Sequence, residues 1–270
     1  MTGELIRLTP LDLGLAGALV LALAALTWYG RLGVTRSLLI AAARTVVQLL
    51  LVGLVLQTLF DHAAWYWVAL MGAVMLLIAG REVMARQKRR FLGVWGFGLG
   101  TGAMFLSSFS VTVLALLAMI QPEPWYMPQY AIPLLGMLLG NTMTGIALAV
   151  DRLTDGAWRQ QGLIDARLAL GEPWTRAVED LRREAMRNGM IPMINAMAAA
   201  GIVSLPGMMT GQILAGAPPM DAVQYQILIM FLITVGTGFG TLIAVWLAAG
   251  RLFDERHRLR LDRLTVAKAA

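Results

Sequence analysis

Residues 65–120 read WYWVALMGAVMLLIAG REVMARQKRR FLGVWGFGLGTGAMFLSSFSVTVLALLAMI, two apolar runs joined by ten residues that carry five cations. Each run is close to or above the roughly 20 residues with which an α-helix crosses the hydrocarbon core of a bilayer. The first begins with Trp65, Tyr66 and Trp67, an aromatic flank typical of a membrane interface. The stretch therefore predicts two membrane spans with a basic connection on one side.

The composition of the whole chain agrees with this interpretation. Of its 270 residues, 58% are hydrophobic and 14% are charged, whereas soluble domains carry about 25% charged residues. The net charge of +6 would suggest a nucleic-acid partner in a soluble protein. Here the basic residues fall between apolar runs, so they indicate membrane orientation and no nucleic-acid binding. The chain has no cysteine, which excludes disulfide and thiolate chemistry.

We therefore predict an all-α polytopic membrane protein, a single permease-like domain over residues 1–270. The hydrophobic pattern predicts seven transmembrane helices, and the third is short. Their approximate ranges are 11–29, 37–60, 65–80, 93–120, 130–150, 190–215 and 222–250.

The distribution of cations predicts the orientation of these spans. Twenty of the 22 Lys and Arg residues lie in alternate connections and in the tail after residue 250. The opposite connections hold Asp61, Glu123 and Asp221 and no cation. Under the positive-inside rule this pattern requires an odd number of spans, with the N-terminus outside and the C-terminus in the cytoplasm. Arg7, in the N-terminal tail, and Arg44, inside a span, are the two exceptions.

The longest polar stretch, 151–189, is expected to form a cytoplasmic helical hairpin. Thr154 or Asp155 can begin its first helix, residues 171–173 (Gly-Glu-Pro) interrupt the pattern, and a second charged helix follows over 174–188. Fewer than forty residues cannot bury a catalytic core. The hairpin is therefore predicted to be a docking element, and the alternative is a solvated hairpin without a partner.

Several catalytic classes are excluded by what the sequence lacks. No phosphate-binding G-x-x-x-x-G-K-[ST] motif occurs. The glycine clusters 96–102 and 236–240 lie inside apolar spans, where small residues four apart favour close helix packing. His62 and His257 fall on opposite sides of the membrane in this topology and cannot share a site. The chain is thus expected to be no enzyme by itself and to bind no cofactor.

Polar side chains within the spans are candidates for a translocation path. Arg44 and Gln48 share one face of the second span, and an intramembrane Arg is costly unless it faces protein or water. Arg44 either ties helices together or lines a path, and the amides Asn141 and Asn195 have the same two interpretations. Thioethers bind soft metals but also fill gaps in helix packing. The candidates are Arg44, Gln48, Met137, Asn141, Met143, Asn195, Met208 and Met209, and the metal, if any, is unknown.

Prolines within the predicted spans favour bending. Pro133, Pro192 and Pro206 interrupt helical hydrogen bonding and leave carbonyl groups that need other partners. Such helices suit a transporter more than a passive anchor. The hinge candidates are Pro192, Pro206, Gly207 and Gly211.

Several stretches together resemble the Fet-type iron-export permease family of ABC transporters, which also includes plant aluminium-tolerance permeases. The resemblance covers residues 30–255, and its most specific element is the string SLPGMMTG within 203–211. The matching stretches are 44–49 (RTVVQL), 132–137 (IPLLGM), 140–143 (GNTM), 203–211 (VSLPGMMTG) and 222–226 (AVQYQ).

This resemblance implies a multi-pass permease of the inner membrane that exports iron or a related metal. It also implies a separate ATPase subunit that uses ATP, with two copies of each chain in the complex. ABC permeases present a coupling helix whose signature runs Glu-Ala-Ala, three residues, then Gly, and 165–171 is similar. The following Ile191-Pro192 lies further from Gly171 than in that pattern. The coupling candidates are Asp165, Ala166, Gly171, Glu172 and Trp174.

Two other functions remain open from the residues alone. A stand-alone secondary transporter or channel normally needs an ionisable pair at mid-membrane to couple ions, and Arg44 alone is a weak candidate for this role. A scaffold or receptor subunit would not need a kinked sixth span.

Overall fold

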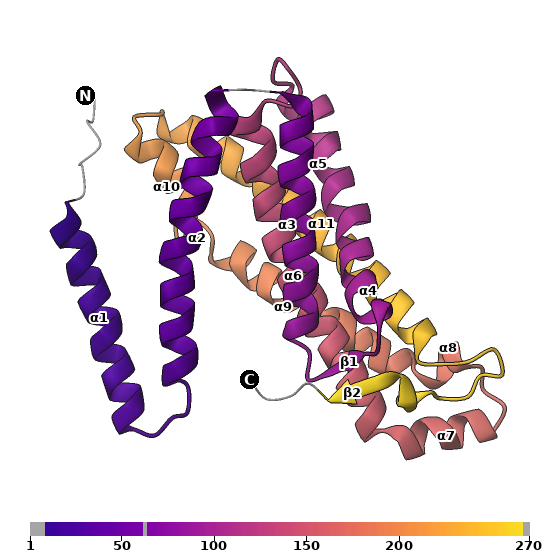
Figure 1. The fold of residues 1–270 in the computed structure, drawn as a ribbon. Coiled ribbons are helices and arrows are strands. Elements are labelled where there is room, and N and C mark those ends of the chain that lie inside the picture. The colour runs from indigo at the N-terminus through magenta and orange to yellow at the C-terminus, as the bar shows by residue number, and fades with distance from the viewer. Residues whose placement is uncertain (1–8, 62–63, 267–270) are drawn as a thin grey trace.

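The computed structural model describes residues 9–61 and 64–266 of the chain (Figure 1). Apolar runs form helices because, in lipid, every backbone N–H and C=O must be paired within the segment. The elements are α1 Pro10–Tyr29, α2 Thr35–Asp61, α3 Trp65–Ala85, β1 Arg89–Phe91, α4 Val94–Met104, α5 Ser110–Leu114, α6 Pro128–Arg159, α7 Gln161–Ala169, α8 Trp174–Ala177, α9 Glu179–Ala199, α10 Gly207–Leu214, α11 Pro219–Arg251 and β2 Leu264–Val266.

Within the described residues, six helices are long and apolar enough to cross a membrane. They correspond to six of the seven predicted spans. The fourth, Val94–Ile120, joins α4 and α5 and includes two π-helical segments, Phe105–Phe109 and Ala115–Ile120. The prediction of an all-α membrane protein is therefore confirmed.

The expectation of one helix across 190–215 is wrong. The helix α9 ends at Ala199, an irregular turn follows, and α10 begins at Gly207. Gly201 adopts a φ of +80°, and Leu205 is disfavoured in a helix because Pro206 follows it. The N–H groups of residues 202–204 all donate to the carbonyl of Ala199, the last residue of α9, so this carbonyl at the end of the helix has hydrogen-bond partners. Figure 1 shows α9 and α10 as separate helices, with α10 beside the start of α11.

Buried residues form two apolar clusters in the body made by α3 to α6, α9 and α11. The larger cluster also includes residues of α7, α8 and β2, and the smaller one joins α5, α6, α9 and α11. The predicted role of the glycine clusters in close packing is confirmed for Gly96, Gly100, Gly236 and Gly240, whereas Gly98 and Gly102 have no neighbour within 4 Å of a Cβ. A Cβ on Gly100 would lie 2.8 Å from Val83, and a Cβ on Gly236 would lie 2.8 Å from Leu138.

The hairpin of α1 and α2 stands to one side of this body (Figure 1). Most of its apolar side chains are exposed on the single chain. In the described residues, α1 packs mainly on α2, and α2 meets the body chiefly at α3 and α6. A lipid-facing surface of this kind needs no protein cover.

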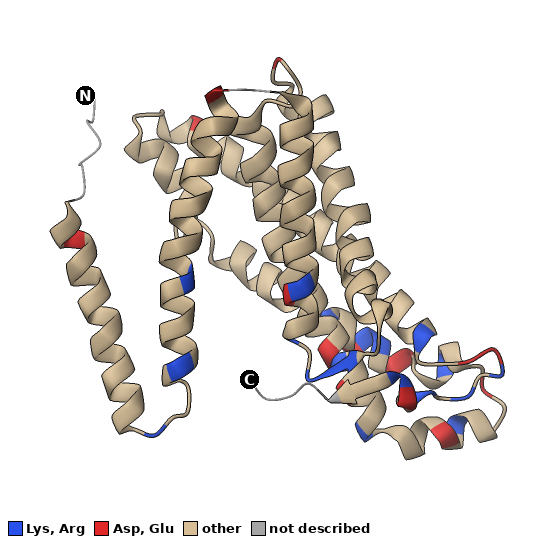
Figure 2. Ribbon diagram, in the orientation of Figure 1, with Lys and Arg blue, Asp and Glu red and all other residues tan. Residues whose placement is uncertain are grey.

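Lys and Arg gather at the end of the molecule that holds α7, α8 and the sheet (Figure 2). The strand β2 pairs antiparallel with β1, with Arg90 opposite Thr265. Together with residues 252–263, β2 forms what we call the C-terminal arm, an element that the sequence analysis did not predict. Arg7, His62 and Lys268 lie outside the described residues, so the predicted placement of His62 is untested.

The predicted hairpin at 151–189 differs from the structure at both of its ends. Thr154 and Asp155 do not begin a helix, because α6 continues without interruption to Arg159. Thr154 instead donates to the Arg89 carbonyl at 3.0 Å, and Asp155 forms ion pairs with Arg89 and Arg159. The second helix is divided into α8 and α9, and α9 extends into the predicted sixth span.

Candidate functional site

An ion pair joins α2 of the N-terminal hairpin to α3 of the body. The Nη2 atom of Arg44 lies 2.9 Å from Oε1 of Glu82, and the two side chains are 54% and 29% exposed. Glu82 belongs to the last part of α3, because this helix continues to Ala85 and passes the predicted end of the span. Pairing with a carboxylate lowers the cost of placing Arg44 inside a span.

A second arginine extends this contact to α6. Arg86 follows Glu82 by one helical turn, and its Nη1 donates to Oγ1 of Thr144 at 3.4 Å. The Thr144 hydroxyl in turn donates to the Gly140 carbonyl of its own helix at 3.1 Å. Contacts between polar side chains therefore connect α2 to α3 and α3 to α6 in the same region of the structure.

Arg44, Glu82 and Arg86 line an open cleft of about 470 Å³ between the three helices. Two thioethers, Met75 and Met143, and the Gln48 amide contribute to its wall. Gly140 leaves room on the α6 side, where a Cβ would meet no atom within 4 Å, whereas a Cβ on Gly136 would lie 3.1 Å from the Met75 side chain. We call this space the central cleft. It is lined by Ala41, Arg44, Thr45, Gln48, Met75, Ile78, Ala79, Glu82, Arg86, Gly136, Leu139, Gly140 and Met143.

The charges in the central cleft do not form a conventional metal cage. Two guanidinium groups, on Arg44 and Arg86, face the single carboxylate of Glu82. Within residues 9–61 and 64–266, no group of three or more His, Cys, Asp or Glu side chains is placed to hold a metal ion. Hard divalent cations take oxygen ligands, usually including carboxylates. The cleft is better matched to an oxyanion or to a complex with exposed oxyanions, which arginine forks bind well.

The structure brings together three of the predicted path residues, Arg44, Gln48 and Met143. Asn141 lies beside Gly140 on an exposed part of α6, where its amide donates to the Met137 carbonyl at 2.8 Å. Asn195 is exposed on α9, and its side chain makes no hydrogen bond within the described part of the chain.

The remaining path candidates lie elsewhere. Met137, Met197 and Met208 pack against the smaller apolar cluster, which contains Met193. The backbone N–H of Met209 donates to the side-chain oxygen of Gln226 at 3.3 Å, which ties α10 to α11. The thioethers of Met137 and Met208 therefore fill space between helices, as methionine commonly does.

Glu82 is the residue of the central cleft that sequence reasoning missed. The predicted third span ended at residue 80, which placed Glu82 in the basic connection. Two signals could have found it: an arginine at membrane depth calls for an acidic partner, and Glu82 stands one turn before Arg86 on the same helix face.

A cap formed by α7 and α8 projects from the basic end of the body. Ile164 is 2% exposed and anchors α7 in the larger cluster. Four of the predicted coupling residues, Asp165, Ala166, Gly171 and Glu172, are exposed on the other side of the cap. The neighbouring Leu163 and Leu170 are exposed as well.

Two local features fix the shape of this cap. Gly171 has a φ of +88°, which favours glycine, and the Glu172 N–H closes the turn on the Arg167 carbonyl at 3.2 Å. Trp174, the fifth coupling candidate, points inward and stacks on Phe253 of the C-terminal arm, with ring centroids 5.5 Å apart. The cap is therefore held from both sides, by α6 and by the arm.

The cap leads directly into α9, which carries one of the predicted hinge residues. Arg167 pairs with Asp180 at 3.1 Å, so α7 is tied to the start of α9. Pro192 lies inside α9 without ending the helix, whereas Pro206 and Gly207 begin α10 after the break. Gly211 is exposed in α10, with space around its Cα. The main interruption is at 200–206, where Gly201 was not predicted as a hinge.

Comparison with known proteins gives a family match over most of the chain. The sequence model described as "Uncharacterised protein family (UPF0014)" matches residues 10–253. No solved structure matches the chain.

Relatives from bacteria and plants align over nearly the full length. The chain is 41% identical to "UPF0014 membrane protein slr1647" of Synechocystis over 96% of this chain and 98% of that protein. It is 30% identical to "Protein ALUMINUM SENSITIVE 3" of Arabidopsis thaliana over 91% and 88%. It is 29% identical to "Probable iron export permease protein FetB" of Escherichia coli over 96% and 97%. The resemblance stated from the sequence motifs is confirmed.

Proposed function

The chain belongs to the UPF0014 family of membrane proteins, and we propose that it is the permease subunit of an ABC transporter that exports iron or a related metal. ATP would be bound and hydrolysed by a separate ATPase subunit. The observation that carries this proposal is the cap, whose exposed coupling residues stand at the basic end and whose chain continues into the broken α9–α10 segment.

The basic end would face the cytoplasm, in the inner membrane of a cell. The positive-inside rule supports this orientation, because cations gather at this end (Figure 2). A crossing by α9 and α10 would supply the seventh span and place the N-terminus outside. Irregular backbone at membrane depth is tolerated where it is buried in protein or lines a water-filled cavity.

The cap is the proposed contact for the ATPase. Leu163 and Leu170 offer apolar anchors beside the carboxylates of Asp165 and Glu172, and exposed apolar patches with polar rims are typical of protein interfaces. Nucleotide-driven movement of the ATPase would shift the cap. The tie between Arg167 and Asp180 would pass the shift into α9, and the break at 200–206 would allow α9 to move relative to α10.

A second copy of the chain would complete the translocation path. Asn141 and Asn195 are exposed on the single chain, although both lie in segments predicted to span the membrane. Polar side chains at membrane depth face protein or water and not lipid. A homodimer that places α6 and α9 toward its partner would enclose these amides and border the central cleft.

The charge of the central cleft bears on the form of the substrate. With two arginines and one carboxylate, the cleft carries excess positive charge. A bare divalent cation would be repelled, whereas a metal carried by an anionic chelator would be attracted. We therefore propose that the metal moves as a complex.

The Arg44–Glu82 pair also favours one alternative, a stand-alone secondary transporter or channel. An ionisable pair inside a span is a feature that such proteins use to couple ions. The two functions differ in their need for ATP. ATP-dependent transport by the purified complex, absent without the ATPase, would exclude the alternative.

The coupling role is tested by replacing Gly171 in the reconstituted complex of permease and ATPase. In Gly171→Val, a non-glycine residue at positive φ costs about 1–2 kcal/mol, so the turn should change shape. We expect ATP hydrolysis stimulated by the metal complex to fall at least fivefold, while membrane insertion is unchanged.

Gly162→Val is the matched control for this experiment. Gly162 lies in α7, the helix that precedes the turn at Gly171, has no positive φ, and has open space around its Cα. Its stimulated ATP hydrolysis should stay within twofold of the unmodified complex. Equal stimulation in the Gly171 and Gly162 variants would contradict the coupling role.

A further inference from the structure

A second, larger pocket lies at the basic end, away from the central cleft. Its volume is about 930 Å³, and it is enclosed by the end of α11, the start of α4, α8 and the C-terminal arm. Its wall combines three tryptophans with four arginines, two carboxylates and a few apolar groups. The transport mechanism proposed above uses none of these arginines.

Three of the four arginines that line this pocket have no carboxylate partner among residues 9–61 and 64–266. Arg258 pairs with Asp254 at 2.9 Å, whereas Arg251, Arg256 and Arg263 form no ion pair with any residue that the structure describes. The Nε atom of Arg251 is buried and has no hydrogen-bond partner in the described chain. The pocket therefore presents positive charge whose hydrogen-bonding capacity is not fully used.

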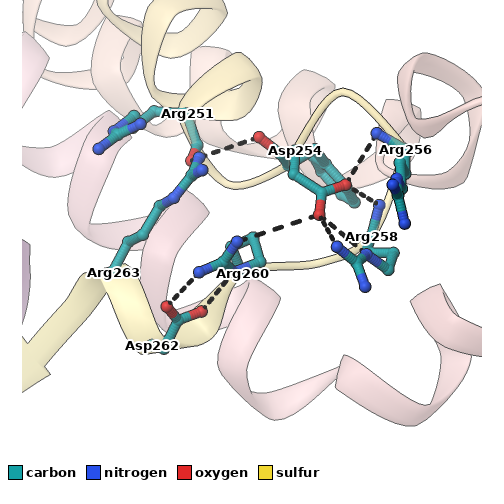
Figure 3. A network of polar contacts seen from close by, with 8 residues as sticks. Arg251, Asp254, Arg256, Arg258, Arg260, Asp262 and Arg263 are labelled. Carbon is teal, nitrogen blue, oxygen red and sulfur yellow. Dashed lines mark hydrogen bonds and ion pairs between the residues drawn. The ribbon is translucent and has the colours of Figure 1, made fainter.

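The two carboxylates of the pocket do not cancel this charge. Asp254 accepts hydrogen bonds from the backbone N–H groups of Arg256 and Arg258, each at 2.9 Å, and from the Arg258 side chain (Figure 3). Its role is to fold the arm. Arg263 contributes to the same fold by donating from Nη1 to the carbonyls of Arg251 and Phe253. Glu255 is exposed and is outnumbered by the arginines.

Tryptophans place this charge at the level of a membrane interface. The Arg251 guanidinium lies 4.9 Å from the centre of the Trp95 ring, and Arg182 lies 4.2 Å from that of Trp246. Both rings are about half exposed. Tryptophan is enriched where the hydrocarbon core meets the headgroups. A cation that contacts these rings would therefore lie in the headgroup region of the bilayer.

An apolar stripe on α11 leads from the membrane body to this pocket. Val235, Phe239, Leu242 and Trp246 follow one another at spacings of four, three and four residues, and all four are exposed. This spacing places them on one helix face. A free phosphate ion would make no use of such a stripe, whereas the acyl chains of a lipid would lie along it.

We propose that this pocket binds the phosphate group of an anionic phospholipid, with the acyl chains along the α11 stripe. Basic pockets beside transmembrane helices recognise lipid headgroups in this way. Such a lipid would also hold the arm against the body, because Arg256, Arg258 and Arg263 all belong to the arm. The match to the family model ends at Phe253, so these three arginines come from beyond the matched region.

The proposal is tested with the full-length purified chain in neutral detergent. Binding of phosphatidylglycerol, phosphatidylcholine and inorganic phosphate is measured by native mass spectrometry and by the shift in Tm. We expect phosphatidylglycerol to bind and stabilise the chain, and the other two to have little effect. The double variant Arg251→Gln/Arg256→Gln should bind phosphatidylglycerol about 25-fold more weakly, or about fivefold for each arginine removed.

The matched control is Arg176→Gln/Arg187→Gln. Both residues are exposed near the same end, lie outside the pocket, and form no ion pair in the described chain. Their replacement removes the same charge and should change the affinity less than twofold. If the pocket variant elutes as a misfolded protein, Arg256→Gln alone is measured, because its exposed side chain is not required by the fold.

Three results would overturn the proposal. An equal loss of affinity in the control would assign binding to the general charge of the basic end. Equal stabilisation by inorganic phosphate would assign the pocket to a free anion, and equal binding of phosphatidylcholine would show that the negative charge is not recognised. None of these measurements uses ATP or metal, so they are independent of the proposed transport function.

Discussion

The paired carboxylates of the basic end and of the central cleft differ in the number of arginines that they contact and in their exposure. At the basic end, Asp155 contacts both Arg89 and Arg159 and is 14% exposed, and Asp254 is similarly enclosed by the arm. In the cleft, Glu82 has one close partner, Arg44, whose side chain is more than half exposed. Two glycines of α6 differ in the same way: a Cβ on Gly156 would lie 2.3 Å from Leu181, whereas a Cβ on Gly140 would meet no atom within 4 Å.

This difference indicates which part of the molecule moves as a unit and which part changes its contacts. Enclosed ion pairs and close helix contacts resist rearrangement, since packed interiors deform little. A single ion pair beside an open cleft exchanges partners at low cost. The basic end therefore suits a rigid connection to an external subunit, and the cleft suits a gate that opens and closes.

The largest effect is expected from a substitution at the α6–α9 crossing. A Cβ on Gly189 would lie 2.7 Å from the Gly145 carbonyl oxygen and 2.9 Å from the Ala149 Cβ. Gly189→Val should therefore force the two helices apart and cost about 3 kcal/mol or more. The measurement is the yield of monodisperse protein and its Tm in detergent.

Gly140→Val provides the comparison within the central cleft. No atom lies within 4 Å of a Cβ at Gly140, so its Tm should stay within about 2 °C, corresponding to less than 1 kcal/mol for a chain of this size. A similar loss in both variants would show that the cleft is as tightly packed as the crossing, which would remove the basis of the comparison.

A smaller effect on stability, but a large one on transport, is expected at the ion pair of the cleft. Glu82→Gln leaves Arg44 without its carboxylate inside a span. Because Arg44 is more than half exposed, the cost in stability should be about 1 kcal/mol. Transport by the reconstituted complex should fall at least tenfold if the pair is part of the gate.

The double variant Arg44→Gln/Glu82→Gln separates the two roles of this pair. It removes both charges, so its Tm should return toward that of the unmodified chain while transport stays low. Glu179→Gln, which breaks the exposed pair with Arg183 on α9, is the control at the basic end. Its transport should be unchanged. Restored transport in the double variant would show that the pair acts only as a structural tie.

The sequence predicted the helices well where hydrophobic length alone determines them, and less well where local backbone preferences compete with hydrophobic length. Hydrophobic length predicted six of the spans, because bilayer thickness sets it directly. It failed across 190–215, where the apolar pattern continues but Gly201 and Pro206 end the helices. The composition of this stretch resembles that of its neighbours, so the break depends on local backbone preferences.

The residues of the candidate site were predicted in part for a related reason. Arg44 and Gln48 were evident because polar groups in an apolar run are costly. Their partner Glu82 lies among cations at the end of α3, where an acidic residue carries no such signal. The C-terminal arm was missed because the charges after residue 250 were used to predict orientation, and its pairing with β1 depends on contacts distant in sequence.

The smallest effect is expected from acid titration of the C-terminal arm. The Arg260 guanidinium donates two hydrogen bonds of 2.8 Å to Asp262 and lowers the pKa of that carboxyl from 3.8 to about 2. A carboxyl with a lowered pKa contributes stability above its ordinary pKa, and this contribution is lost as the pH falls through the lowered value. The arm should therefore remain in place from pH 7 to pH 4 and loosen between pH 4 and pH 2.

Pepsin cleavage within 252–266, identified by mass spectrometry at pH 4, 3 and 2, measures this loosening. In Asp262→Asn the contact with Arg260 is weaker at every pH, so cleavage should already be raised at pH 4 and should increase less on acidification. Hydrogen bonds from Arg258 also lower the pKa of Asp254, and its protonation accounts for the increase that remains in the variant. An unmodified arm that is cleaved readily at pH 4 would contradict the view that Asp254 and Asp262 are firmly paired in the arm. The contrast with the exposed pair of the central cleft would then lose its support.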